Sequence, residues 1–434
     1  MMLQMTLRTL IYGARQIVTV TRNNDEKFLC GKDMQAIGII KSDVVGLSLM
    51  IENENIIAIG TDDDIARQFE GIEVDKKIDA SGCCILPGFV DAHTHPIWAG
   101  DRVHEYAKKL AGATYMEIMR EGGGIGFTVE KTKLATDKEL LVSLVARLKR
   151  MLQAGTTHVE CKTGYGLEWS DELRLLKLLE QARSHVSIGI SITYCAAHAI
   201  PKNRTAEEMT EDIVNKQIKA LKKFIDSKEI NVNDIDVFCE KGVYDIEQSR
   251  RILLAGKEIG LGINFHGDEL NYTGSAEMGA DIGARAISHL ECISDDGIRA
   301  MASAKTFAVI LPHTGYLLRI EMPPVRRMID AGVPVALGTD ANPNAFSSAM
   351  SISMNLACVL CHMSLEEALV AATINSAAAL GISDKYGSLE VGKKADLIIC
   401  RCPSWEHIIY QFGDHTHLIL YVLKHGAIVY VKAK

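Results

Sequence analysis

The sequence has no apolar run long enough to cross a membrane. Its longest apolar stretches are of strand length, whereas a membrane helix needs about 20 apolar residues. No long basic run occurs either, and the 434 residues contain 47 Lys and Arg against 55 Asp and Glu, a formal net charge of −8. Nucleic acid binds to clustered positive charge, so we expect neither a nucleic acid nor a membrane as a partner.

The sequence also offers no secretion signal and no disulfide framework. The first 22 residues contain no apolar core of signal-peptide length and no small-residue cleavage site. Arg8 and Arg15 leave a mitochondrial presequence open as an alternative, but residues 17–20 have the pattern of a strand. The 11 cysteines are odd in number and irregularly spaced, which favours free thiols in a reducing compartment. We therefore expect a cytoplasmic protein.

The composition, 47% hydrophobic and 24% charged, is typical of a globular protein of one to three domains. A chain of this size buries enough surface to fold without a metal or a disulfide. Any metal ligands in it must therefore be explained by chemistry.

Between residues 85 and 385, short apolar runs alternate with amphipathic stretches. The stretches are 138–153, 171–183, 205–228, 246–258 and 294–304. The runs are 85–93, 156–162, 191–198, 235–240, 263–266, 286–289, 307–312 and 335–340. Eight buried strands with intervening helices over about 300 residues predict an α/β fold, a (β/α)8 barrel, with a doubly wound open sheet as the alternative.

The two ends of the chain have a different pattern. Residues 1–84 and 386–434 are rich in short β-like runs separated by turn residues. Strands from one end alone would leave exposed edges, so the two ends are expected to pair. We predict one small β-sandwich domain built from residues 1–84 plus 386–434, beside a barrel domain of residues 85–385.

Histidine and aspartate stand where the predicted barrel strands end. The carboxyl ends of barrel strands open into one mouth, where active sites form. A single histidine at a strand end is usually structural, and His158, within a strand, is expected to be so. The conjunction of several such residues in one barrel is harder to explain by chance. The residues at the predicted strand ends are His93, His95, His198, His266, His289 and Asp340.

This set of side chains predicts a metal centre. Residues two apart on a strand point to one side, so His93 and His95 can bind one ion. Imidazole and carboxylate ligands suit Zn(II) or Fe(II), and no cysteine ends the relevant strands, as a structural zinc site would require. Such an ion lowers the pKa of water from about 15.7 to roughly 7. Hydrolysis or deamination of a C–N bond is the expected chemistry.

Other side chains are expected around this centre. Glu269 begins a loop over the mouth and can transfer a proton, whereas its neighbour Asp268 is expected to be structural. His289 can orient or deprotonate the water. Arg102, on a long loop, can bind a carboxylate. The glycine-rich segment 121–126 lacks the context of a phosphate loop, so it is interpreted as a flexible loop.

Five segments resemble the metal-dependent amidohydrolase superfamily and, within it, the imidazolonepropionase family. Residues 86–95 are similar to a strand shared across the superfamily, and the other segments are more specific. The specific segments are WAGDR (98–102), ECKTGYGL (160–167), NFHGDE (264–269) and LGTDANP (337–343). The likeness extends over essentially the whole chain.

The resemblance implies hydrolysis of a small-molecule substrate, 4-imidazolone-5-propanoate, to N-formimidoyl-L-glutamate in histidine degradation, by a homodimer. It implies one Zn(II), Fe(II) or Fe(III) ion per chain, with the ligands His93, His95, His266 and Asp340. It implies substrate contacts by Arg102, Tyr165, His198, Glu269, Asn342, Asn344 and Ala345. The propanoate tail requires a cation, which gives Arg102 a role.

A single ion is expected because the bridging lysine of dinuclear relatives has no counterpart. Such a lysine would end the fourth strand, but Lys241 falls outside that place and Lys162 ends the second strand. In the expected mechanism, water loses a proton to Asp340 or His289 and attacks the ring carbonyl carbon. The metal or His289 stabilises the oxyanion, and Glu269 protonates the departing nitrogen.

Two other functions remain open at this point. Another small-ring amidohydrolase or a nucleobase deaminase would share the metal centre but would not need Arg102. A non-catalytic relative acting as a scaffold would be expected to have lost metal ligands, and this sequence retains them.

Overall fold

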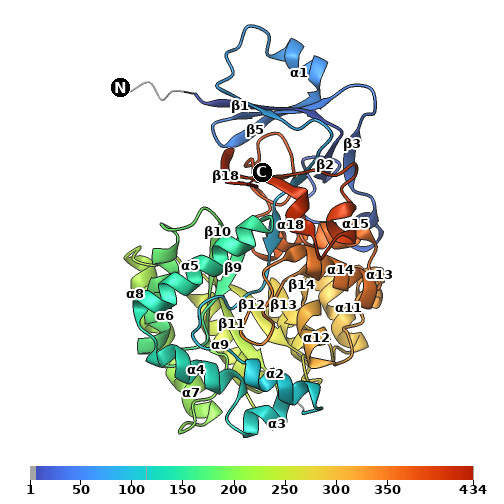
Figure 1. The fold of residues 1–434 in the computed structure, drawn as a ribbon. Coiled ribbons are helices and arrows are strands. Elements are labelled where there is room, and N and C mark those ends of the chain that lie inside the picture. Colours follow the sequence, from blue (N-terminus) through green and yellow to red (C-terminus); the bar gives the residue numbers. More distant parts are fainter. Residues whose placement is uncertain (1–5, 114, 434) are drawn as a thin grey trace.

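The computed structural model describes residues 6–113 and 115–433. Its centre is a parallel sheet of eight strands whose spatial order follows the chain (Figure 1). All seven residues of its second strand are buried, as expected of a strand covered on both faces. The strands are β8 (Phe89–Asp91), β9 (Thr156–Lys162), β10 (Gly189–Ala197), β11 (Asp234–Cys239), β12 (Gly262–Gly267), β13 (Ala286–His289), β14 (Phe307–Ile310) and β15 (Val335–Leu337).

Backbone hydrogen bonds between the first and last of these strands close the sheet into a barrel. Ala92 N donates to Leu337 O over 3.3 Å, and beyond the strands His95 N donates to Ala341 O over 3.1 Å. In an open sheet the two outermost strands are not bonded to each other. The bonds between the ends of β8 and β15 therefore confirm the predicted (β/α)8 barrel.

Helices cover the outside of the barrel. The helix α5 (Asp137–Gln153) begins at a capping box formed by Thr136 and Glu139, and it buries Leu140, Leu144 and Leu148. The helices after the later strands are α6 (Trp169–Ala182), α9 (Ile246–Glu258), α10 (Ser275–Asp281), α11 (Asp295–Ala304), α12 (Pro312–Leu318), α13 (Val325–Asp330), α14 (Met350–Leu360), α15 (Leu365–Ala371) and α16 (Ile374–Ala379). None in the described ranges is long and apolar enough to span a membrane.

The helix predicted over 205–228 is interrupted. It consists of α7 (Ala206–Asp212) and α8 (Ile218–Asp226), joined by a π-helical turn over Ile213–Gln217. The side chain of Gln217 is buried in this turn, and its Oε1 accepts a hydrogen bond from Tyr194 Oη over 2.6 Å. The extra residue of a π turn thus directs a polar side chain inward.

Two further sheets lie above the barrel in Figure 1, one built from the N-terminal end alone and one from both ends of the chain. One has the order β5-β4-β1-β6 and the other β18-β17-β16-β7-β2-β3. Because β7 pairs with β16, the second sheet joins segments more than 300 residues apart. The strands are β1 (Arg8–Ala14), β2 (Gln16–Val20), β3 (Gly38–Lys41), β4 (Leu47–Glu52), β5 (Asn55–Thr61), β6 (Lys76–Asp79), β7 (Cys84–Pro87), β16 (Leu397–Cys400), β17 (Ile419–Lys424) and β18 (Ala427–Val431).

These sheets enclose a core of their own, as predicted for a small β-sandwich. Side chains from both chain ends meet in it, among them Ile11, Leu49, Ile85 and Leu397. Short helical segments accompany the sheets: α1 (Asp62–Gln68), a 3₁₀ turn at Gly31–Gln35, α17 (His407–Tyr410) and α18 (His415–Leu418).

The apolar run 85–93 is divided between the two units. Its first part lies in β7 of the sandwich, and its second part is the barrel strand β8. Gly88 lies at the division, where a Cβ atom would stand 2.2 Å from Thr157 Cγ2. Glycine thus allows the chain to pass against β9 as it enters the barrel.

Three helices follow β8 and lie at the end of the barrel away from the terminal sheets (Figure 1). They are α2 (Val103–Leu110), α3 (Tyr115–Arg120) and α4 (Gly124–Leu134). The glycine-rich segment 121–126, expected to be a loop, is one only in its first half: residues 124–126 begin α4, and Gly124 N donates to Glu105 Oε1 over 2.9 Å. A carboxylate thus binds the position that a phosphate would need in a nucleotide cradle.

Candidate metal-dependent active site

The barrel brings six side chains from distant segments to the carboxyl ends of its strands. His93 and His95 follow β8, His198 follows β10, and Asp340 follows β15. His266 and His289 lie within the last two residues of β12 and β13. Every one of these residues is buried. The predicted convergence therefore has a physical counterpart in the fold.

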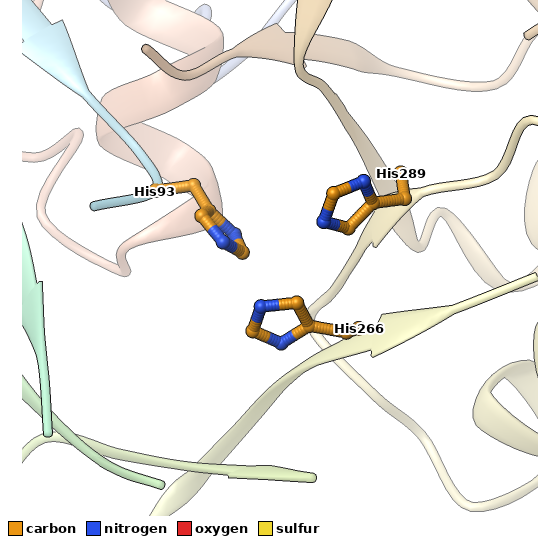
Figure 2. A group of neighbouring side chains, drawn as sticks. All are labelled: His93, His266 and His289. Carbon is orange, nitrogen blue, oxygen red and sulfur yellow. The ribbon is translucent and has the colours of Figure 1, made fainter. Parts of the chain in front are cut away.

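The four residues expected as metal ligands lie close together. His95 Nε2 is 3.1 Å from His266 Nε2, and His93 Nε2 is 3.6 Å from Asp340 Oδ1. His93, His95 and Asp340 each offer a ligand atom within 4.8 Å of the others. His266 forms a similar group with His93 and His289, whose three rings face one another in Figure 2.

In each of the three histidines expected as metal ligands, Nδ1 faces another group of the protein. His93 Nδ1 is 2.8 Å from Ser288 Oγ, and His266 Nδ1 is 2.9 Å from Asp236 Oδ1. His95 Nδ1 faces the carbonyl oxygen of residue 163 at 3.4 Å. Such partners fix the orientation of metal-binding histidines and leave Nε2 for the ion.

Burial keeps these rings in the form that binds metal. Loss of water lowers the pKa of His93, His95 and His266 below the ordinary value, and nearby positive charge at Lys162 adds to this effect. A neutral imidazole has a lone pair to donate, whereas a protonated one has none at that nitrogen.

The residues fit a metal ion. His93 Nε2 is buried and has no hydrogen-bond partner within the described part of the chain. Two nitrogens bound to one ion at about 2.0–2.1 Å lie roughly 3 Å apart, as His95 Nε2 and His266 Nε2 do. Three imidazoles and a carboxylate suit zinc or iron.

Asp340 is held by α12 and by the loop that follows β15. Its Oδ2 accepts a hydrogen bond from Thr314 Oγ1, and its Oδ1 accepts one from Asn342 Nδ2 over 2.8 Å. Asn342 Oδ1 in turn accepts from the backbone N of Asn344 over 2.6 Å and of Ala345 over 3.1 Å. Asn342 thus couples the carboxylate to the backbone that follows it.

Lys162 lies within a buried ion-pair network. Its Nζ is 3.0 Å from Glu160 Oε1 and 2.7 Å from Asp236 Oδ2. Burial opposes a charge on Asp236, but His266 and Lys162 outweigh it and lower the pKa of that carboxyl. Lys162 supports the aspartate that holds His266.

A cavity adjoins the histidine cluster. Residues from both its metal end and its opposite wall line it: His95, Arg102, Ile125, Tyr165, His198, Phe238, His266, Glu269, His289, Thr314, Leu318, Asp340, Asn342 and Asn344. Of the residues expected to contact substrate, only Ala345 is not among its lining; its backbone N instead binds Asn342.

Arg102 brings a cation to this cavity. The residue is 5% exposed, and its Nε donates to Thr128 Oγ1 over 2.9 Å. Its Nη2 is buried with no hydrogen-bond partner in residues 6–113 and 115–433. An unsatisfied guanidinium nitrogen at a cavity wall is suited to bind an anionic group.

Aromatic rings line one side of the cavity. The His198 ring stacks on the His95 ring with centroids 4.5 Å apart and planes 7° apart, and Tyr165 lies 5.4 Å from His198. His198 Nδ1 is 3.0 Å from Gly164 O. Burial lowers the pKa of His198 to about 3, so its ring is neutral; with Nδ1–H donated to Gly164 O, its Nε2 can accept a hydrogen bond from a ligand.

Glu269 and His289 form an acid pair beside the cluster, with Glu269 Oε1 3.7 Å from His289 Nδ1. Burial raises the pKa of Glu269 to about 8. Burial alone would lower the pKa of His289, but the carboxylates of Glu269 and Glu291 outweigh it and raise that pKa to about 10. The carboxylate of Glu269 raises the pKa of His289 only while it is ionised, so the protonation states of the two groups are linked.

Comparison with known proteins identifies the family. The model of the amidohydrolase family matches residues 84–429. This chain belongs to the amidohydrolase family. Proteins named "Probable imidazolonepropionase" from Danio rerio and Homo sapiens are each 54% identical to it, covering 99% and 97% of this chain and 98% of their own lengths. A zinc-bound adenosine deaminase from Xanthomonas campestris has the same fold, with a TM-score of 0.71 at 16% identity, over 97% of this chain and 92% of its own.

The sequence did not indicate the residues that hydrogen-bond to the expected metal ligands. Asp236 and Ser288 lie inside apolar strands, and Thr314 lies in α12. A carboxylate within a run of apolar residues was the one available signal, because an unpaired buried charge is costly. His158, expected to be structural, is 2.9 Å from Ser191 Oγ within the barrel.

Proposed function

We propose that this chain is an imidazolonepropionase, which opens the ring of 4-imidazolone-5-propanoate with water to give N-formimidoyl-L-glutamate. The observation that carries the proposal is the unsatisfied Arg102 guanidinium in the same cavity as the histidine cluster. A small ring with an anionic tail would place its ring at the histidine cluster and its tail at the Arg102 guanidinium. The names of relatives 54% identical over nearly the full length support this substrate.

One metal ion per chain, zinc or iron, is proposed to be held by His93, His95, His266 and Asp340. When bound, the ion supplies a Lewis acid that lowers the pKa of water into the neutral range. Lys162 is paired with two carboxylates, which supports a single ion because a bridging lysine would have to be free of them.

The protein's own groups would move the protons. Asp340 accepts the proton that water loses as its oxygen adds to the ring carbonyl carbon. His289, protonated, donates to the oxyanion that forms there. Glu269, held neutral by burial, gives its proton to the ring nitrogen as the C–N bond breaks. As the C–N bond breaks, the hydroxyl formed from the oxyanion returns its proton to His289, and the proton held by Asp340 restores Glu269. One water is thus divided between the new carboxyl group, which takes its oxygen and one hydrogen, and the released nitrogen, which takes the other hydrogen.

The remaining cavity residues would position the substrate. Arg102 binds the propanoate, with the Tyr165 hydroxyl beside it, and His198 contacts the ring. Asn342, Asn344 and Ala345 form the wall that follows the last strand. A nucleobase deaminase, which binds a neutral ring, would have no use for the Arg102 cation.

The test is a direct assay of the purified, metal-loaded chain. Loss of the imidazolone absorbance with formation of N-formimidoyl-L-glutamate supports the proposal. A chain with full metal content that deaminates a nucleobase and leaves the imidazolone intact contradicts it.

Two further predictions from the sequence belong to this proposal. We propose a homodimer, to be tested by sedimentation equilibrium, and a cytoplasmic enzyme, to be tested by cell fractionation. The 11 cysteines, which form no disulfide, support a reducing compartment.

A further inference from the structure

Glu291 has a buried carboxylate without a hydrogen bond. Its side chain is 3% exposed, and neither Oε1 nor Oε2 has a partner among the residues the structure describes. A buried carboxylate in this state is costly, so its place must serve another group. Glu291 is not among the residues expected at the site from the sequence, and it does not line the cavity.

The group next to this carboxylate is His289. Glu291 Oε1 lies 3.7 Å from His289 Nδ1, which is itself buried without a hydrogen bond in the described ranges. The other ring nitrogen of His289 is turned toward His93 and His266 in Figure 2. Glu291 therefore stands at the nitrogen of His289 that points away from His93 and His266.

A strained turn brings Glu291 to this position. His289 and Leu290 both have positive φ angles, of 78° and 71°. Such conformations are strained for residues other than glycine. Leu290 N donates to Gly267 O over 3.1 Å and Cys292 N to Asp268 O over 2.7 Å, so backbone bonds to the end of β12 hold the turn.

Glu269 does not replace Glu291 in this role. Its Oε1 is also 3.7 Å from His289 Nδ1, but its side chain lines the cavity and is 10% exposed. A group that lines the cavity is available for proton transfer to a substrate, whereas Glu291 lies outside the cavity lining. The two carboxylates thus divide two tasks at one imidazole.

We propose that Glu291 is a positioning residue for the reaction: it accepts the Nδ1–H of His289 and so directs Nε2–H at the oxyanion. This inference rests on the proposed function and extends it to a residue that no comparison assigns. A carboxylate behind a histidine fixes both its ring orientation and the nitrogen that carries hydrogen.

The first test measures turnover of Glu291→Met, which removes the acceptor and keeps the length of the side chain. We expect kcat to fall about 10- to 100-fold, with KM and metal content unchanged. Glu291→Gln keeps an acceptor oxygen and should recover most of the activity. In the His289→Asn background, Glu291→Met should cause no further loss, because the ring that it positions is gone.

A matched control is Glu277→Met, on α10, whose carboxylate binds Ser294 rather than a histidine of the site. This variant should keep the wild-type kcat. The inference is overturned if Glu291→Met keeps the wild-type turnover or loses its metal. It is also overturned if kcat of the double variant falls by the product of the two single losses.

A second readout does not depend on turnover. In crystals of the metal-loaded proteins, His289 should hold a single orientation in the wild type and a rotated or divided one in Glu291→Met. An unchanged ring in the variant overturns the positioning role. A wild-type enzyme that holds metal but leaves the imidazolone intact would instead contradict the proposed function.

Discussion

Nε2 of His95 and Nε2 of His266 lie 3.1 Å apart, although 171 positions separate the two histidines in the chain. Closure of the barrel creates this proximity, because β8 and β12 deliver both residues to one mouth. Each ring is held from behind, His266 by Asp236 and His95 by a backbone carbonyl. The pair therefore has the geometry of two ligands of one ion.

Removing the support behind His266 should weaken metal binding. In Asp236→Asn, His266 loses a charged partner and Lys162 loses one of its two carboxylates. We expect metal affinity to fall about 10- to 100-fold. Competition with a chelator, followed by metal analysis, measures the change. Asp234→Asn, which affects a buried aspartate paired with Arg285, is the control and should retain the metal; equal affinity in Asp236→Asn would contradict the account.

Removing the Arg102 cation should weaken substrate binding selectively. In Arg102→Met the propanoate loses a charge-assisted hydrogen bond, and we expect KM to rise roughly 10- to 100-fold. Steady-state kinetics on the imidazolone measures the rise. Arg150→Met, at an exposed position on α5, should leave KM unchanged. A fall in kcat with constant KM would show that Arg102 has another role.

His289 should affect turnover and leave metal content intact. His289→Asn removes the donor proposed for the oxyanion, and we expect kcat to fall about 10²- to 10³-fold. Metal analysis of the same preparation distinguishes a ligand from a proton donor. Loss of the ion from the variant would make His289 a fifth ligand and would contradict the role assigned to it.

The stability of the barrel should fall in mild acid because of His158. Burial lowers the pKa of this residue well below its ordinary value of 6.5, and the unfolded chain then binds a proton that the folded chain does not. The stability from the neutral ring is present above pH 6.5 and is lost as the pH falls, by about 1 kcal/mol between pH 6.5 and 5.5. Urea unfolding at pH 6.5 and 5.5 should show this additional loss in the wild type relative to His158→Gln.

The exposed His185 offers the control for this experiment. His185→Gln should lose stability between the two pH values as the wild type does. Parallel curves for the wild type and His158→Gln would mean that His158 binds its proton equally well in the folded and unfolded chain.

Local pattern was enough to predict much of the fold. The strands at 156–162 and 286–289 and the helix at 246–258 have the predicted bounds, because buried strands and amphipathic helices have periodicities that single segments reveal. The division of 85–93 was not predictable, since both halves are apolar and only the contact of Gly88 with Thr157 separates them.

The residues of the site were likewise only partly predictable from the sequence. His93 and His95 could be found because metal ligands carry a sequence spacing. Glu291 could not, because its relation to His289 depends on two positive φ angles that give no signal in a sequence of His-Leu-Glu. Supporting residues are defined by tertiary contacts, so they required the structure.

The most direct test of the central claim is anomalous diffraction from crystals of the active enzyme, recorded at the zinc and iron absorption edges. The account predicts one peak per chain, bonded at about 2.0–2.2 Å to His93, His95, His266 and Asp340. Two peaks per chain close to Lys162, or one peak distant from these four residues, would contradict it.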